Sequence, residues 1–113
     1  MITPEKMHAH VYRYILDLNC PSKYNGFWYL RDGVNRVLEN PCEVGCLRKN
    51  VYLAIAEKYR TDICNVERST RTLVDRWWTL THCGGLFDKK PTNAEVFNTL
   101  AARISLEISE EAE

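Results

Sequence analysis

The sequence lacks any long hydrophobic run. Of its 113 residues, 45% are hydrophobic, but no stretch approaches the roughly 20 apolar residues that a membrane-spanning helix needs. The first ten residues, MITPEKMHAH, contain no apolar core of the kind found in secretion signals. We therefore expect one domain of ordinary size that neither binds nor crosses a membrane and that works in the cytoplasm.

The sequence also lacks net charge, since 15 Lys and Arg residues balance 15 Asp and Glu residues. A neutral chain argues against strong nonspecific binding to nucleic acid. The charge is nevertheless uneven, because residues 107–113 form an acidic tail with four glutamates and no base, which leaves residues 1–106 at +4. From Lys58 to Arg76, five basic residues face three acidic ones. This local excess is modest, so any specific binding would depend on base contacts or on a partner.

Metal-ligand and catalytic patterns are missing as well. Only Cys42 and Cys46 are close-spaced among the five cysteines, and no second pair with a linking histidine follows. A small zinc protein would need four converging ligands, so reduced thiols are the simpler interpretation, and we expect no metal and no cofactor. No paired carboxylates accompany a histidine, and no Ser or Cys nucleophile signature is present. The sequence therefore predicts that the protein is not an enzyme.

Strand-like alternation is absent too, whereas apolar residues recur at helical spacing along the chain. Helix starts are predicted at Thr3, which precedes a proline, and at the capping box formed by Thr92 and Glu95. Gly33 within the second helix indicates close approach of a neighbouring helix. Further helices are predicted from Gly26 to Asn40, from about Leu47 to Tyr59 and from Asp62 to about Leu80, with a loop over 41–46. We expect an all-α fold, a compact bundle of about five to six helices of the winged-helix-like or response-regulator effector class, in a single domain over 1–113.

The most informative stretch is IAEKYRTDICNVERSTRTLVDRWW, which runs from residue 55 to residue 78. A short helix, a turn and a longer helix follow one another here with the spacing of a helix-turn-helix, over about residues 47–80. Ala56 is small, as the helix crossing requires, and Val66 is expected to pack back onto the first helix. Arg60 takes the turn position where positive φ usually selects glycine, at a steric cost. This pattern predicts an element that enters the DNA major groove.

The segments YLRDGVNRVLEN, IAEKYRT, NVERSTR and KPTNAEVFNTLAARISLE occur in this order along the chain. Together they resemble the C-terminal DNA-binding effector domain of the sporulation master response regulator of endospore-forming bacteria, from about Ile15 to Glu107. The resemblance implies an all-helical fold of about six helices that binds double-stranded promoter DNA at a short box containing G·C pairs. It also implies transcription regulation, copies bound in tandem as a dimer on DNA, and contact with RNA polymerase.

Site residues follow from the positions that match. Arginine can donate two hydrogen bonds to guanine O6 and N7, and glutamate can accept from cytosine N4. Flanking polar residues would reach a base or a phosphate, whereas lysines and arginines outside the helix would contact phosphates and set the register. The base-reading candidates are Asn65, Glu67, Arg68, Arg71 and Thr72. The phosphate-contact candidates are Lys58, Arg60, Lys89 and Lys90.

The chain departs from the family pattern in three places. A length of 113 residues leaves no room for the receiver domain that the family carries, so we expect either an excised domain or a stand-alone relative. The stretch from Trp78 to Lys90 is shorter than the family pattern, which predicts the loss of a short helix that contacts the transcription machinery. Arg60 and Thr72 replace the family's residues, and Arg76 and Trp77 are additions to the second helix of the motif.

An alternative function remains open at the level of sequence. The neutral charge, the acidic tail and Trp78 favour a protein-interaction module that keeps the fold but binds a related regulator or RNA polymerase in place of DNA. Glu67 and Arg71 would then be an ordinary solvent-exposed ion pair at i,i+4 spacing. Trp78 itself is expected to be a half-buried helix cap in preference to a contact surface.

Overall fold

The computed structural model describes residues 2–40 and 47–112, with side chains described over 2–40 and 50–110. These ranges contain helices and turns and no strand, so the all-α prediction is confirmed and the described part of the chain has no β-hairpin wing. None of the described helices is long and apolar enough to span a bilayer. The elements in chain order are α1 (Pro4–Asp17), α2 (Asn25–Glu39), the π-helix η2 (Leu47–Tyr52), α3 (Leu53–Lys58), α4 (Ile63–Thr81), the 3₁₀ turn η3 (Cys83–Gly85) and α5 (Asn93–Ala112).

The predicted helix starts are confirmed by their capping hydrogen bonds. The Thr3 side chain accepts from the Lys6 amide, and Pro4 occupies the first turn of α1. At the start of α5, the Thr92 amide donates to the Glu95 carboxylate at 3.1 Å while the Thr92 hydroxyl accepts from the Glu95 amide at 3.2 Å. This reciprocal pair is the capping box that the sequence predicts.

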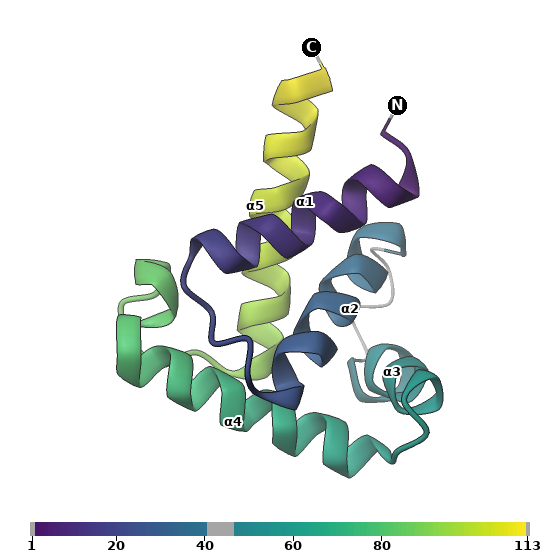
Figure 1. The fold of residues 1–113 in the computed structure, drawn as a ribbon, viewed down its shortest axis with the longest axis vertical. Helices are drawn as coiled ribbons and strands as arrows, with labels where there is room; N and C mark the ends of the chain where they lie inside the picture. The colour runs from purple at the N-terminus through teal and green to yellow at the C-terminus, as the bar shows by residue number, and fades with distance from the viewer. Residues whose placement is uncertain (1, 41–46, 113) are drawn as a thin grey trace.

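Helix α2 forms the centre of the bundle and packs against α1, α3, α4 and α5 (Figure 1). Its inward side chains include Phe27, Leu30 and Val34, all fully buried. Gly33 confirms the predicted close approach, because a Cβ atom there would lie 2.3 Å from Cε1 of Phe97 on α5. The contact between α2 and α5 therefore fixes the position of α2, against which α4 packs.

Replacing Gly33 with alanine is expected to destabilise the fold by about 1–3 kcal/mol, because the added methyl overpacks the contact with Phe97. The sign of this change in stability is informative, since replacing glycine with alanine at an unobstructed helix position stabilises the fold by about 0.5–1 kcal/mol. Urea denaturation followed by circular dichroism measures the difference. Adding Phe97→Leu should recover part of the loss, and a Gly33→Ala variant as stable as the parent would show that the helices do not meet here.

The third predicted helix differs from the structure in its first half. The prediction of one helix over 47–59 is wrong there, because Leu47–Tyr52 is wound as a π-helix and the α-helix begins only at Leu53. Apolar periodicity identifies the buried face, where Val51 and Tyr52 lie, but it does not distinguish two windings that bury the same residues. The loop predicted over 41–46 lies outside the described residues.

The segment after α4 is short and tightly turned. The loss of a helix relative to the family pattern stays a prediction. Four consecutive residues, His82 to Gly85, have positive φ, and only Gly84 and Gly85 are glycines. Left-handed backbone costs about 1–2 kcal/mol for each of the other two. Burial of Cys83 and stacking of the His82 ring on Trp78, with centroids 4.3 Å apart, oppose that cost. Trp78 is half-buried at this helix end, as expected for a cap.

Candidate nucleic-acid interface

The turn between α3 and α4 has the strained conformation that the sequence predicts. Arg60 has φ of 54° and ends α3 without the glycine usually found there. The Thr61 amide donates to the Ala56 carbonyl at 2.9 Å, and the Arg60 amide donates to the Glu57 carbonyl at 3.4 Å, which closes the helix end. The Asp62 carboxylate then accepts from the Asn65 amide at 2.7 Å and starts α4. These contacts fix the angle between the two helices.

Helix α4 separates cleanly into a buried face and an exposed face. Its inward residues are Val66, Thr70, Leu73, Val74 and Trp77, each at most 1% exposed. Ser69, which lies between the two faces, is only partly buried. The two sides of the turn, Ala56 and Val66, are both buried, as expected for a packed helix pair. Because one face is fully used in the core, only the opposite face can meet another molecule.

Three of the base-reading candidates, Arg68, Arg71 and Thr72, lie on that exposed face. The side chain of Arg68 makes no hydrogen bond or ion pair with the residues that the structure describes. Arg71 donates to the Glu67 carboxylate at 2.5 Å, one helical turn earlier. The structure therefore brings the two arginines together and gives Arg71 a carboxylate that orients its guanidinium group.

Asn65, the first base-reading candidate along α4, has a more constrained side chain. Its Nδ2 group donates to the Thr61 hydroxyl at 2.9 Å, and its Oδ1 atom accepts from the Ser69 hydroxyl at 3.5 Å. Asn65 is therefore held against the turn and against its own helix. The arrangement braces the N-terminal end of α4.

Two residues that support α4 were not predicted from the sequence. Asn93 donates through Nδ2 to the Glu67 carbonyl at 3.2 Å and to the Tyr52 hydroxyl at 3.1 Å. Burial is the largest cause of the raised pKa of Tyr52, so the phenol stays protonated at neutral pH. Asn93 thus joins η2, α4 and the start of α5. The signal available in the sequence is the place of Asn93 in the segment KPTN, which also contains the phosphate-contact candidate Lys90 and the capping residue Thr92.

Lys90 lies beside α4 although it belongs to the loop before α5. Its ammonium group is 2.6 Å from the Asp75 carboxylate, and the two side chains are 52% and 44% exposed. Lys89 and Arg60 are also exposed, in the same loop and in the turn before α4. The structure therefore assembles Lys90 with the exposed face of α4. It leaves Lys89, the neighbour of Lys90 in the loop, and Arg60, in the turn before α4, accessible.

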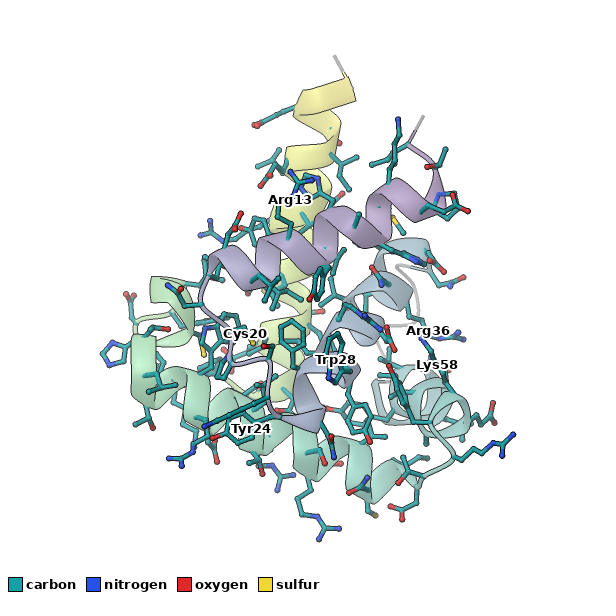
Figure 2. The ribbon with its side chains drawn as sticks, viewed as in Figure 1. Arg13, Cys20, Tyr24, Trp28, Arg36 and Lys58 are labelled. Atoms are coloured by element: carbon teal, nitrogen blue, oxygen red, sulfur yellow. The ribbon has the colours of Figure 1, made fainter. Side chains whose placement is uncertain are left out.

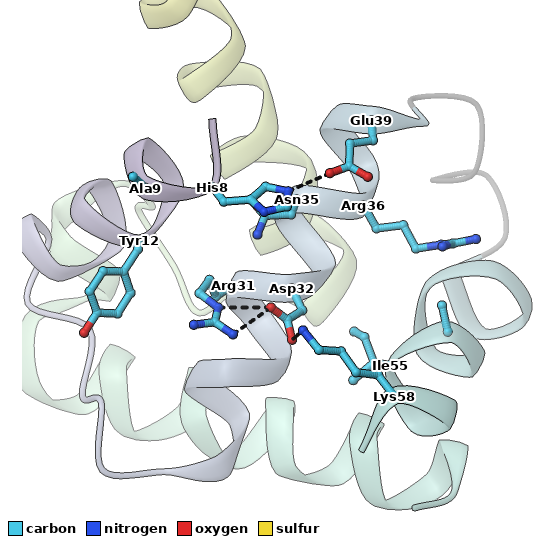
Figure 3. Close-up of a pocket in the computed structure, with 11 residues that line it drawn as sticks. His8, Ala9, Tyr12, Arg31, Asp32, Asn35, Arg36, Glu39, Ile55 and Lys58 are labelled. Carbon is cyan, nitrogen blue, oxygen red and sulfur yellow. Dashed lines mark hydrogen bonds and ion pairs between the residues drawn. The ribbon is translucent and has the colours of Figure 1, made fainter. Parts of the chain in front are cut away.

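Lys58 is placed differently, in a cleft of about 520 Å³ between α1, α2 and α3 (Figure 3). Its ammonium group is 2.9 Å from the Asp32 carboxylate, which also pairs with Arg31 at 3.0 Å (Figure 3). Tyr59 donates to the same carboxylate at 2.5 Å, and burial followed by this hydrogen bond raises the pKa of Tyr59 to about 12. Lys58 therefore belongs to an ionic cluster that ties α3 to α2. It is not grouped with Arg68, Arg71 and Thr72 on the exposed face of α4.

Among the residues that the structure describes, Cys20, Cys64 and Cys83 form no disulfide, and Cys20 and Cys83 are buried. Burial raises the pKa of Cys20 well above its usual range and that of Cys83 to about 11. Cys64 is exposed, whereas Cys42 and Cys46 lie outside the described residues. Within the described ranges, no group of three or more His, Cys, Asp or Glu side chains could hold a metal ion.

Comparison with known protein families agrees with the resemblance seen in the sequence. The family model described as the sporulation initiation factor Spo0A C terminal matches residues 11–104, which include the second half of α1, all of α2, α3 and α4, and much of α5. That family is the DNA-binding effector domain of Spo0A, which implies DNA binding, transcription regulation and sporulation. The match covers most of the 113 residues. The chain therefore belongs to the family of sporulation initiation factor Spo0A C-terminal domains, which are DNA-binding regulators of transcription.

Proposed function

We propose that the chain binds double-stranded promoter DNA in a sequence-specific way, with α4 in the major groove, and catalyses no reaction. The observation that carries the proposal is the division of α4 into two faces. One face is locked in the core, and the other presents Arg68, Arg71 and Thr72 to solvent on a helix that a braced turn holds in position. A helix held this way loses little conformational freedom when it enters the groove.

Arg68 and Arg71 are the principal base readers in this proposal. Each guanidinium group can donate two parallel hydrogen bonds to O6 and N7 of a guanine in the major groove. The Glu67 carboxylate, which now accepts from Arg71, would accept from N4 of a cytosine in a neighbouring pair. This set of donors and acceptors selects a box that contains G·C pairs, with Thr72 and Asn65 at its edges.

Phosphate contacts would set the register of the helix on the duplex. Lys89, Lys90 and Arg60 are the candidates that the structure leaves accessible near α4. Lys58 would take this role only by exchanging its pair with Asp32. Because the basic excess is small, specific binding is expected to weaken only modestly with salt compared with strongly basic DNA-binding proteins.

The same proposal covers the partners and the place of action. Bound to promoter DNA in the cytoplasm, copies of the chain would lie in tandem on adjacent boxes and contact RNA polymerase. The competing proposal, an interaction module without DNA function, draws on the neutral net charge. The two proposals differ in one measurable property, which is binding to duplex DNA.

The test is a gel-shift titration against a pool of random duplexes, at low and at moderate salt, followed by sequencing of the retained fraction. The proposal expects salt-sensitive retention at micromolar protein and enrichment of a short G·C-containing box over successive rounds. Absence of retention at both salt concentrations would reject DNA binding and favour the interaction module. Retention without enrichment of any sequence would reject specific reading.

A further inference from the structure

A cluster of two cations, Lys23 and Arg76, gathers around the side chain of Tyr24 beside α4. Arg76 donates through Nε to the Tyr24 hydroxyl at 3.1 Å, and the Lys23 ammonium lies 5.4 Å from the centre of the Tyr24 ring. Lys23 and Arg76 are both exposed. Neither pairs with a carboxylate in the part of the chain that the structure describes. The cluster therefore presents two positive charges to solvent, both of which are held against the side chain of Tyr24.

The position of this cluster is fixed by close packing of α2 on α4. A Cβ atom at Gly26 would lie 2.3 Å from the Ser69 carbonyl oxygen of α4, so the two backbones meet at this point. Tyr24 is the residue before α2 and lies at this junction, over α4 (Figure 2). The cluster therefore occupies a rigid corner next to the base-reading candidates.

Arg76 continues the exposed row of α4 beyond those candidates. Arg68, Thr72 and Arg76 are spaced at i, i+4 and i+8, so they follow one another along the same side of the helix. At about 1.5 Å per residue, Arg76 lies about 12 Å beyond Arg68 along the helix axis. The major groove is about 12 Å wide. A helix that reads bases with Arg68 would therefore carry Arg76 to the edge of the groove, where the phosphates lie.

The cluster and Lys90 lie on opposite flanks of this row. With about 3.6 residues per turn, Arg71 and Asp75 fall on one side of Arg68, and Thr72 and Arg76 fall on the other. Lys90 pairs with Asp75 and so marks the first flank. Each flank of a helix in the major groove faces one sugar-phosphate strand. Contact with both strands requires a cation on each flank, and Lys90 and the cluster of Lys23 and Arg76 meet this requirement.

We propose that Lys23 and Arg76 form a phosphate clamp for the DNA strand opposite the one that Lys90 approaches. The inference rests on the proposed function and adds a binding site to it. Tyr24 positions the clamp, because its hydroxyl accepts from Nε of Arg76 and leaves the terminal N–H groups of the guanidinium for phosphate oxygens. Hydrogen bonds from guanidinium to phosphate are charge-assisted and frequently bidentate.

The test measures the affinity for a selected duplex over a series of salt concentrations. The variants are Lys23→Gln, Arg76→Gln, the double variant and Tyr24→Phe. Arg13→Gln is the matched control, because Arg13 is exposed on α1 and lies away from α4 (Figure 2). Far-UV circular dichroism and thermal melting verify that each variant keeps the parent fold. Arg76→Lys tests whether the charge alone is sufficient.

Each lost phosphate contact is expected to reduce the slope of log K against log salt by about 0.9. The double variant should therefore lose about twice that amount, with the ranking of box sequences unchanged, whereas Arg13→Gln should match the parent. Tyr24→Phe should keep the slope and lower the affinity less than removal of either cation. Arg76→Lys keeps the positive charge and should therefore restore the parent's slope, which Arg76→Gln reduces.

Two results would overturn the clamp in different ways. A double variant that binds with the parent's slope and affinity, while Arg68→Ala still loses specific binding, would reject the clamp and leave the proposed function standing. A parent chain that shows no salt-dependent binding to any duplex would reject the proposed function and the clamp with it.

Discussion

Replacing Arg68 with alanine is expected to lower the affinity for a selected duplex by about 1–3 kcal/mol, and replacing Arg71 by a similar amount. The effect should be confined to duplexes that carry the selected box, because each guanidinium group is assigned to one guanine. The double variant is expected to retain only nonspecific binding. Fluorescence anisotropy on the selected box and on a scrambled duplex of the same composition measures both quantities.

The fold should be unaffected, because Arg68 and Arg71 are exposed on the face of α4 opposite the core. Arg103→Ala is the matched control, since Arg103 is an exposed arginine on α5. Arg68→Lys separates charge from geometry, because lysine keeps the charge but lacks the planar fork. Binding of the double alanine variant as tight as that of the parent would exclude these residues as base readers.

Replacing Trp77 with alanine is expected to destabilise the protein by about 3–5 kcal/mol. Trp77 is fully buried and is the largest such side chain in the described core. Its Nε1 group donates to the Leu18 carbonyl at 3.0 Å and so ties α4 to the end of α1. The substitution removes this hydrogen bond and leaves a cavity. A loss of this size is a large part of the 5–15 kcal/mol typical of a whole domain.

Urea denaturation monitored by far-UV circular dichroism measures this loss without relying on tryptophan fluorescence. Trp78→Ala is the internal comparison, because Trp78 is only half-buried and should cost less. Trp77→Phe should fall between the two, since it keeps most of the apolar burial and leaves the Leu18 carbonyl without its donor. Loss of less than about 1 kcal/mol in Trp77→Ala would contradict the packing assigned to α4.

The helices and their starts could be predicted from the sequence because local chemistry determines them. Thr3, Asp62 and the pair of Thr92 and Glu95 cap their helices through contacts within three residues. The positive φ of Arg60 follows from the fixed geometry of the turn. The π-winding of Leu47–Tyr52 could not be predicted, because apolar periodicity defines a buried face and not the number of residues per turn.

The site was predictable only where it follows from the periodicity of α4. The exposure of Arg68 and Arg71 follows from the helical spacing of the buried residues around them. Contacts between distant segments do not follow from spacing. Asn93 on Glu67 and Lys58 on Asp32 join residues 26 positions apart, and the pair of Arg76 and Tyr24 spans 52. These pairings required the packed structure.

Guanine methylation interference on the selected box tests most directly the claim that α4 reads bases in the major groove. A methyl group on guanine N7 blocks the bidentate contact with an arginine. We expect methylation of at least one guanine in the box to prevent binding of the parent chain. We also expect the Arg68→Ala variant to become insensitive to methylation of the guanine that Arg68 contacts. Binding of the parent chain that tolerates N7 methylation at every guanine of the box would contradict major-groove reading by α4.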